Sequence, residues 1–474
     1  MAPRRAKPTG KPSFFNATAL EKFVVGRGFQ AVHASRLWRV VVRALREVDV
    51  PDASTRGEAL ERLVWAKALA LRADARQKLP RACVELASQN FLLFASTADA
   101  FEESRDGDTT KLVLRLRDGH RVEAVAMRHG SRTTVCVSSQ VGCAMGCQFC
   151  ATGTMGIIGD LDASEILEQL AHVTLNECRR GRAAPRNVVF MGMGEPLNNY
   201  AVVRAAVEAM CDPFHWGLRK KGVTVSTVGV APALRKLTRE LPDVRVALSL
   251  HAPTQALRER IVPAARHWPL DELVGALDDH LAKTAKRHSS SSSGMMVEYV
   301  LIKGVNDAPA EADALAALFA KRNVYLNIIP YNKNVTAELH GFEPPDEATA
   351  RAFGKRIIDA GVRVRLRKEY GADIAAACGQ LALDSAAAKK SFNAIDIEDA
   401  AGGPAGPAKR RTRTFGPRKA APEARAAPTA APTAAPTAVP TAAPTAAPRA
   451  RPDLGGYLFA AISLTSAALL LCPG

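Results

Sequence analysis

The sequence predicts an α/β fold: a partial (β/α)6-type TIM barrel, preceded by a small helical domain and followed by a disordered tail. Apolar runs typical of buried parallel strands alternate with longer segments of helical periodicity. The composition changes near residue 386, where proline and alanine replace these periodic patterns. With 474 residues, the chain is long enough for two or three domains and a sizeable core.

The charge and cysteine content narrow the class of protein. The net charge of +17 and the pI of about 9.7 favour a polyanionic partner, although part of the excess lies in the tail and could be functionless. Nine cysteines scattered along so long a chain are unlike a secreted disulfide scaffold and indicate a reducing compartment. We expect the cytoplasm, with an organelle stroma or matrix as the alternative.

The N-terminal part divides into a short basic segment and a helical region. Residues 1–13 are basic and Pro-rich without an apolar core, so they are no secretory signal; a transit peptide and plain disorder both stay open. Residues 14–100 are expected to form a helical accessory domain that binds RNA, with Ser35 capping one helix. Basic side chains recur on one face of that helix, as a phosphate-binding stripe or a solvated face, at Arg36, Arg39, Arg43 and Arg46.

A β-hairpin is expected within residues 101–128, which link the helical domain to the core. Apolar and polar residues alternate over 111–117 and over 121–127, and Asp118-Gly119 between them is a typical turn. Taken alone, Glu123 would be one more strand residue that points to solvent.

The core is expected over residues 129–385. Asp162, with Glu165 three residues on, can cap the first core helix, and further helices are expected at 271–285 and 310–322. In barrels of this class the chemistry lies at the carboxyl ends of the strands. Strands are expected at 133–138, 188–190, 223–227, 244–249, 295–302, 324–329 and 362–366.

Two segments are not expected to pack. The serine run 289–293 is typical of a surface loop, and in the tail, residues 386–474, prolines recur every four residues from 428 to 448. The apolar end, residues 457–471, is shorter than the ~20 residues that usually span a bilayer. It is either a tail anchor or an idiosyncratic end, and we expect no stable membrane partner.

Three cysteines stand close together in Cys143-Ala-Met-Gly-Cys147-Gln-Phe-Cys150, after the apolar run 135–137. Structural zinc takes four protein ligands, and no fourth Cys or His lies nearby in the sequence. A 4Fe–4S cube held by three thiolates keeps one iron free for another ligand. Ordinary buried thiols, or a zinc site completed by a distant residue, are the alternatives.

Five motifs in order carry a resemblance to a known family: Cys136-Val-Ser-Ser-Gln-Val-Gly-Cys143 through Cys150, Phe190-Met-Gly-Met-Gly-Glu-Pro-Leu-Asn198, Ser249-Leu-His-Ala-Pro253, Ile328-Ile-Pro-Tyr-Asn332 and Gly371-Ala-Asp-Ile-Ala-Ala-Ala-Cys-Gly-Gln-Leu381. Over residues 14–385 the chain resembles the radical S-adenosylmethionine (SAM) RNA adenine methyltransferases of the RlmN/Cfr type. The tail has no counterpart in this pattern.

The resemblance implies roles for particular residues. One [4Fe–4S] cluster would be held by Cys143, Cys147 and Cys150. Cys378 would carry the methyl group as S-methylcysteine, Cys136 would resolve the intermediate through a transient disulfide, and Glu123 would accept a proton. SAM would be contacted by Gly194, Glu195, Ser226, Ser249, Leu250, His251 and Asn332.

The resemblance also implies a reaction. One SAM methylates Cys378, and a second yields a 5′-deoxyadenosyl radical that takes hydrogen from that methyl group. The carbon radical adds to C2 of an adenine, and resolution leaves a disulfide that an external reductant reopens. The expected substrate is large-subunit ribosomal RNA, transfer RNA stays open as a second substrate, and the expected state is a monomer. Methylation at C8, and a non-catalytic RNA-binding relative, are the alternatives.

Overall fold

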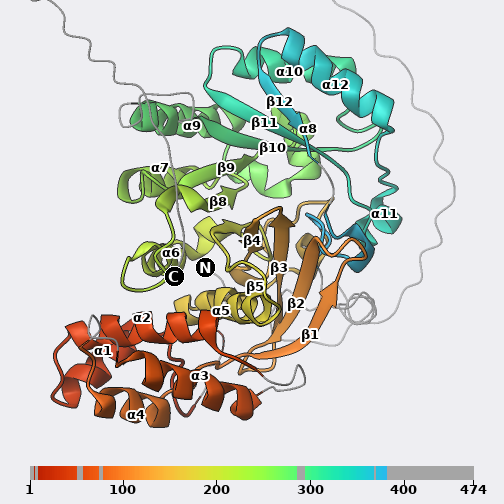
Figure 1. The fold of residues 1–474 in the computed structure, drawn as a ribbon. Coiled ribbons are helices and arrows are strands. Elements are labelled where there is room, and N and C mark those ends of the chain that lie inside the picture. The colour runs from red at the N-terminus through yellow and green to blue at the C-terminus, as the bar shows by residue number, and fades with distance from the viewer. Residues whose placement is uncertain are drawn as a thin grey trace, which may run out of the picture. The chain divides into compact units, whose positions relative to one another are not determined.

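The computed structural model describes residues 5, 9–50, 57–73, 78–285, 294–367 and 370–381 (Figure 1). Most of the basic segment 1–13, the serine run 289–293, and the tail with its apolar end therefore lie outside the described residues. Among the residues that are described, no helix is both long enough and apolar enough to cross a membrane.

A single 10-stranded sheet organises the described part of the chain. Its strand order is β1-β2-β3-β4-β7-β8-β9-β10-β11-β12, and β5 and β6 pair separately. The strands are β1 Thr97–Glu103, β2 Thr109–Arg115, β3 Arg121–His129, β4 Arg132–Cys136, β5 Gln140–Gly142, β6 Ile157–Asp160, β7 Asn187–Phe190, β8 Val223–Thr227, β9 Arg245–Ser249, β10 Met295–Leu301, β11 Val324–Pro330 and β12 Arg363–Leu366.

The strand pairing changes from antiparallel to parallel at β4, and the parallel part determines where a site can form. β1 to β4 pair antiparallel, whereas each pair from β4–β7 to β11–β12 is parallel. Helices connect the parallel strands and cover the outside of the curved sheet (Figure 1). The predicted partial barrel and its strand positions are confirmed, and the carboxyl ends of the parallel strands meet at one edge.

The core helices begin where the sequence provides caps. Asp162 and Glu165 form the predicted capping box of α5, and Asp346 accepts a hydrogen bond from the Thr349 amide at the start of α12. The core helices are α5 Ala163–Arg179, α6 Tyr200–Cys211, α7 Ala231–Glu240, α8 Gln255–Ile261, α9 Leu270–Ala285, α10 Pro309–Phe319, α11 Val335–His340 and α12 Glu347–Asp359.

Four helices form the N-terminal region: α1 Ala17–Gly26, α2 Val32–Glu47, α3 Gly57–Leu71 and α4 Arg81–Asn90. Phe14, Phe15 and Trp38 pack ring against ring in its centre. The prediction that Ser35 caps a helix is wrong. α2 begins at Val32, because the preceding turn runs directly into the helix and the backbone amide of Gln30 donates to Nδ1 of His33.

The arginine stripe of α2 contacts the rest of the protein. Arg39 and Arg46 donate to the backbone carbonyls of Pro213 and Trp216, and the Arg39 guanidinium lies 4.4 Å from the centre of the Phe214 ring. Arg43 pairs with Glu47 on its own helix. The stripe is therefore not a fully solvated face, because two of its arginines contact the segment after α6.

The strands before the parallel part differ from the sequence-based expectation in two ways. β1 was not predicted, and it crosses the boundary expected at residue 100 to pair with β2. Glu123, which the strand pattern taken alone would place in solvent, is 2% exposed. Alternation alone assigns a strand a polar face, but here that face is covered by the remainder of the barrel.

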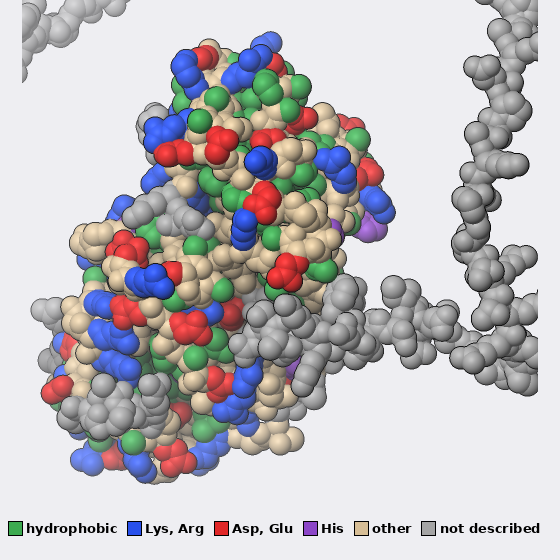
Figure 2. All heavy atoms as spheres, turned by 90° about the vertical axis from the view of Figure 1, so that its right-hand side faces the viewer, with side chains coloured by type: hydrophobic (Ala, Val, Ile, Leu, Met, Phe, Trp, Pro, Cys, Tyr) green, Lys and Arg blue, Asp and Glu red, His purple; other side chains and the backbone are tan. Residues whose placement is uncertain are grey.

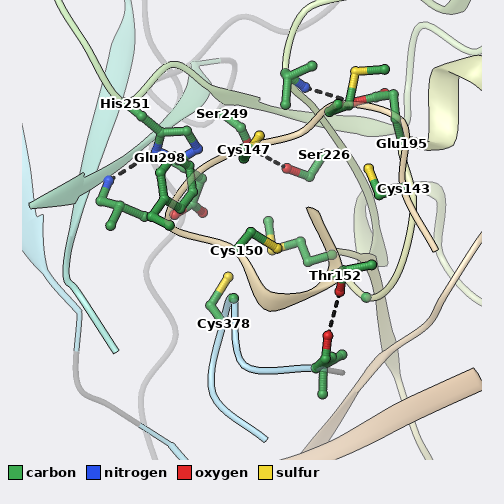
Figure 3. Close-up of a pocket in the computed structure, with 18 of the residues that line it drawn as sticks. Cys143, Cys147, Cys150, Thr152, Glu195, Ser226, Ser249, His251, Glu298 and Cys378 are labelled. Atoms are coloured by element: carbon green, nitrogen blue, oxygen red, sulfur yellow. Dashed lines mark hydrogen bonds between the residues drawn. The ribbon is translucent and has the colours of Figure 1, made fainter. Parts of the chain in front are cut away.

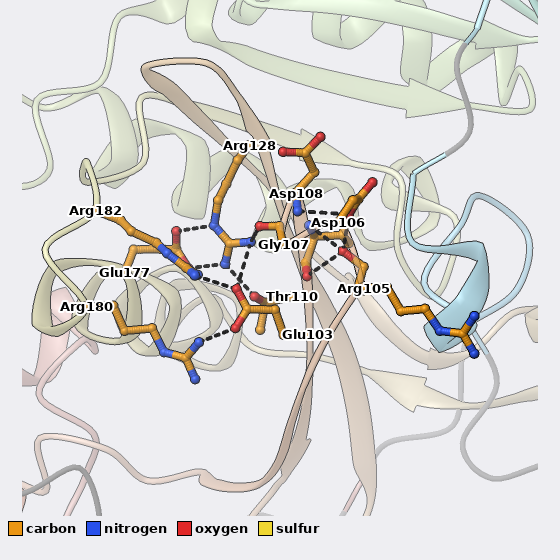
Figure 4. A network of polar contacts seen from close by, with 12 residues as sticks. Glu103, Arg105, Asp106, Gly107, Asp108, Thr110, Arg128, Glu177, Arg180 and Arg182 are labelled. Atoms are coloured by element: carbon orange, nitrogen blue, oxygen red, sulfur yellow. Dashed lines mark hydrogen bonds and ion pairs between the residues drawn. The ribbon is translucent and has the colours of Figure 1, made fainter.

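An ion-pair network that is buried at Arg128 and Glu177 joins this antiparallel part to α5 (Figure 4). Arg128 on β3 donates two hydrogen bonds of 2.8 Å to the carboxylate of Glu177, whose side chain is 0% exposed. Arg128 also donates to the Gly107 carbonyl in the β1–β2 turn. Glu103 of β1 accepts from Arg180 and Arg182. The network therefore fixes β3, the strand that carries Glu123, against α5.

We expect Arg128→Ala to lower the free energy of unfolding by about 3 kcal/mol, because it leaves the buried Glu177 carboxylate without its bidentate partner. Chemical denaturation measures the change. Arg351→Ala is the matched control, since its pair with Glu347 joins side chains that are both 72% exposed, and it should leave stability unchanged. Equal stability losses for the two variants would contradict the role given to Arg128.

Candidate active site

One cavity opens at the carboxyl ends of the parallel strands (Figure 3). The loops after β7, β8, β9 and β11, the end of β10 and the cysteine loop all contribute to its wall. Most of the predicted site residues line it: Cys143, Cys147, Cys150, Gly194, Glu195, Ser226, Ser249, His251, Asn332 and Cys378. Residues far apart in the sequence therefore share one space.

The cysteine loop lies between β5 and the short helix Ala151–Met155. A Cβ on Gly153 would lie 2.7 Å from the carbonyl oxygen of Cys147, so the loop can close on itself only with glycine there. Burial raises the pKa of the Cys143 thiol to about 12 and that of Cys147 well above its ordinary value. Burial thus keeps both thiols neutral at pH 7, although the charge of Arg258 acts to lower the pKa of Cys147.

The spacing of the three sulfurs bears on the kind of metal centre. Among the described residues, no group of three His, Cys, Asp or Glu side chains is arranged to hold a single metal ion. A cube differs from a single ion, because each thiolate binds a different iron and the sulfurs stay further apart. Three thiols from one loop that line the same cavity match the protein ligands of a cube with one open iron.

Gly194 and Glu195 follow β7. Gly194 has a φ of +95°, and a Cβ there would lie 2.5 Å from the Cβ of Gln140, so a larger residue does not fit. The Glu195 carboxylate accepts hydrogen bonds of 2.9 Å from the amides of Leu197 and Val228. Burial raises its pKa to about 7. An ammonium group bound beside it would return this carboxylate to its charged form.

The loops after β8 and β9 supply small polar groups. The Ser226 and Ser249 hydroxyls lie 3.1 Å apart. His251 adopts a φ of +62°, and its Nδ1 accepts a hydrogen bond from the Val300 amide. Leu250 does not line the cavity, because its side chain is fully buried in the core, and only its backbone lies near the site.

Cys378 lies next to the cysteine loop, beside Cys150 (Figure 3). Its carbonyl accepts a 2.9 Å hydrogen bond from Asn332. Burial raises the pKa of its thiol, and the neighbouring Arg367 opposes that rise. Cys136 is 7% exposed, and burial, together with the nearby Cys378 thiol, raises its pKa to about 12. Both thiols are free.

Glu123 and Cys136 lie on neighbouring strands but outside the cavity wall. Cys136 pairs directly with Val125, and Glu123, two residues before Val125, shares its face of the sheet. The carboxylate of Glu123 lies 3.9 Å from the ammonium group of Lys111. The register therefore places the predicted proton acceptor on the same face as the predicted resolving cysteine.

A second cavity of about 390 Å³ adjoins the first and shares Asn332 and Cys378 with it. Met127, Lys333, Arg367 and Tyr370 are among its other lining residues. Cys378 therefore lines both cavities.

Two residues beside Cys378 were not predicted. Glu298 is 4% exposed and accepts a 2.9 Å hydrogen bond from Asn327. Glu298 could have been recognised from the sequence, because it is a charged residue inside the apolar run 295–302. Arg367 gave no such signal, because it follows a strand rich in other arginines.

Known proteins resemble this chain over the same region. Residues 137–316 match the model of the radical SAM superfamily. A probable dual-specificity RNA methyltransferase RlmN of Frankia alni is 44% identical over 287 residues, which are 59% of this chain and 66% of that protein. The protein of the same description from Desulforudis audaxviator is 42% identical, over 59% of this chain and 83% of its own length. The chain belongs to the RlmN family.

A solved structure agrees with this RlmN membership. The crystal structure of a radical SAM methyltransferase from Sphaerobacter thermophilus is 32% identical, with a TM-score of 0.67, over 78% of this chain and 98% of that one. By fold and sequence, this RlmN family member is thus similar to radical SAM methyltransferases. The part aligned with the Frankia relative is just under two thirds of that relative's length.

Proposed function

We propose that this protein methylates C2 of an adenosine in large-subunit ribosomal RNA, and also acts on transfer RNA, through a methyl group carried on Cys378. The observation that carries the proposal is the position of Cys378, which lines both the cavity of the cysteine triplet and the adjoining cavity. The names of the relatives, which describe dual-specificity RNA methyltransferases, support an RNA substrate.

The residues present fit the two cofactors of this chemistry. Cys143, Cys147 and Cys150 would hold a [4Fe–4S] cluster, leaving one iron open. When bound, the cluster and SAM together supply the reducing electron, the methyl group and the radical that activates it. Glu195 offers a carboxylate to the SAM ammonium, and polar groups that could fix the rest of SAM come from Ser226, Ser249, His251 and Asn332.

The chain's own residues would carry the methyl group and accept the protons. Adenine C2 is a poor nucleophile, whereas a thiolate is a good one, so Cys378 takes the methyl group first and loses its proton. The guanidinium of Arg367 beside Cys378 favours that thiolate. After the carbon–carbon bond has formed, the adduct returns the one electron taken up earlier and Glu123 accepts the C2 proton. Cys136 then gives up its own proton and attacks the sulfur of Cys378. The sulfur–carbon bond breaks, the methylene carbon takes up a proton to become the methyl group, and the two sulfurs form a disulfide that an external dithiol must reduce.

The second cavity suits the target nucleotide. Arg132, Arg365 and Arg367 lie near His129 and, after burial, help to lower its pKa, so positive charge gathers beside this cavity. Such a cluster binds phosphates. Over the face shown in Figure 2, Lys and Arg side chains are mixed with Asp and Glu. Recognition would therefore depend on local charge and RNA shape more than on one uniform basic face.

Anaerobic reconstitution with iron and sulfide, followed by an assay on unmodified ribosomal RNA and transfer RNA with methyl-labelled SAM, tests the proposal. We expect label in RNA, and mass mapping of the nucleosides should give 2-methyladenosine. Label at C8 would show instead that the protein catalyses the alternative reaction, methylation of adenine at C8. A reconstituted protein that binds RNA but holds no iron or sulfide would make it a non-catalytic relative.

A further inference from the structure

The loop that carries Cys150 and the loop that carries Cys378 meet at the side chain of Asn334, a residue that no motif singled out. Asn334 is half-buried at the start of α11. Its amide nitrogen Nδ2 lies 3.1 Å from the carbonyl oxygen of Phe149, 3.2 Å from that of Gly379 and 3.1 Å from that of Asn332. One amide group thus contacts the residue before Cys150 and the residue after Cys378.

The two loops are also in direct contact around this amide. The backbone amide of Ala151 donates a 2.8 Å hydrogen bond to the Gly379 carbonyl, and the Thr152 hydroxyl donates to the Leu381 carbonyl. Gly379 has a φ of +84°, and a Cβ added there would lie 4.0 Å from the Cα of Cys150. The Cys378 loop therefore approaches the cysteine loop backbone to backbone, and its position depends on a few hydrogen bonds.

A simpler reading is that Asn334 only caps α11. Its Oδ1 does accept a 2.8 Å hydrogen bond from the Thr336 amide, as an N-cap residue should. The cap uses the oxygen of the side chain, however, and the contacts to the two loops use the nitrogen. The two roles are therefore separable by substitution.

We propose that Asn334 is a positioning residue that fixes the sulfur of Cys378 relative to the cysteine loop. The inference rests on the proposed function, in which a hydrogen atom passes from the methyl group on Cys378 to the 5′ carbon derived from SAM, giving 5′-deoxyadenosine. Such transfers need reacting atoms about 3–3.5 Å apart, and a misplacement of about 1 Å costs on the order of a hundredfold in rate. A displaced Cys378 would thus let SAM be consumed without methyl transfer.

Asn334→Asp is the decisive variant. It keeps an oxygen to cap α11 but replaces the Nδ2 donor with an oxygen that faces the carbonyls of Phe149 and Gly379. Asn16→Asp is the matched control, since Asn16 caps α1 through Oδ1 in the same way and lies on an exposed surface.

The first measurement needs no cofactor. In cluster-free protein, hydrogen exchange of the Ala151 amide, which donates to Gly379, should be faster in Asn334→Asp than in the wild type and unchanged in Asn16→Asp. The second uses the reconstituted enzyme. The ratio of 5′-deoxyadenosine to methylated RNA should rise by about tenfold or more in Asn334→Asp, with unchanged iron content.

The inference is overturned if Asn334→Asp shows both the wild-type exchange rate of the Ala151 amide and the wild-type ratio of 5′-deoxyadenosine to methylated RNA. Asn334 would then only cap α11. A wild-type protein that methylates no RNA would instead refute the proposed function. In that case the exchange comparison still decides whether Asn334 holds the two loops together, so the two failures are distinguishable.

Discussion

Cys378→Ala should abolish RNA methylation, with a rate loss of at least about a thousandfold, the scale expected when a covalent nucleophile is removed. The reason is that no other described thiol lies where Cys378 does, between the cavity of the cysteine triplet and the adjoining cavity. Cluster binding should survive, because the substitution leaves Cys143, Cys147 and Cys150 in place.

Methyl-labelled SAM and unmodified RNA measure this loss, and iron and sulfide analysis measures the cluster. Cys211→Ala is the matched control, because Cys211 ends α6 away from both cavities, and this variant should keep wild-type activity. Residual methylation by Cys378→Ala at more than about one part in a thousand of the wild-type rate would refute the carrier role.

Cys136→Ala should stop the reaction at a later point and trap RNA on the protein. The methyl carbon would already be bonded to both adenine and Cys378, and the thiol that breaks the sulfur–carbon bond would be missing. The loss should be as complete as for Cys378→Ala in multiple-turnover assays. Only the Cys136 variant, however, should form a covalent adduct, because only it retains the carrier.

A denaturing gel reports the adduct as a protein band of reduced mobility that nuclease treatment restores. The double variant Cys136→Ala with Cys378→Ala is the control, and it should show no such band. If Cys136→Ala turns over normally without an adduct, Cys136 does not resolve the intermediate. Its burial and its closeness to Cys378 would then be features of the core alone.

Part of the site could be predicted because it depends on local patterns. The CxxxCxxC spacing lies within one loop, and Gly194-Glu195 and Ser249 each end an apolar strand. The capping box of α5 was likewise readable, since both partners lie within four residues. Glu123 was harder, because an alternating strand does not reveal whether its polar face is later covered.

By itself, the sequence determined the partial barrel, the cysteine triplet and the order of the motifs, because strand periodicity and ligand spacing are properties of contiguous residues. Only the tertiary structure decided that Cys378 adjoins Cys150, that Arg367 and Glu298 lie beside it, and that the arginines of α2 contact Pro213 and Trp216. Asn334 belongs to this second group. Such contacts join residues that are far apart in the sequence, and only the folding of the sheet brings them together.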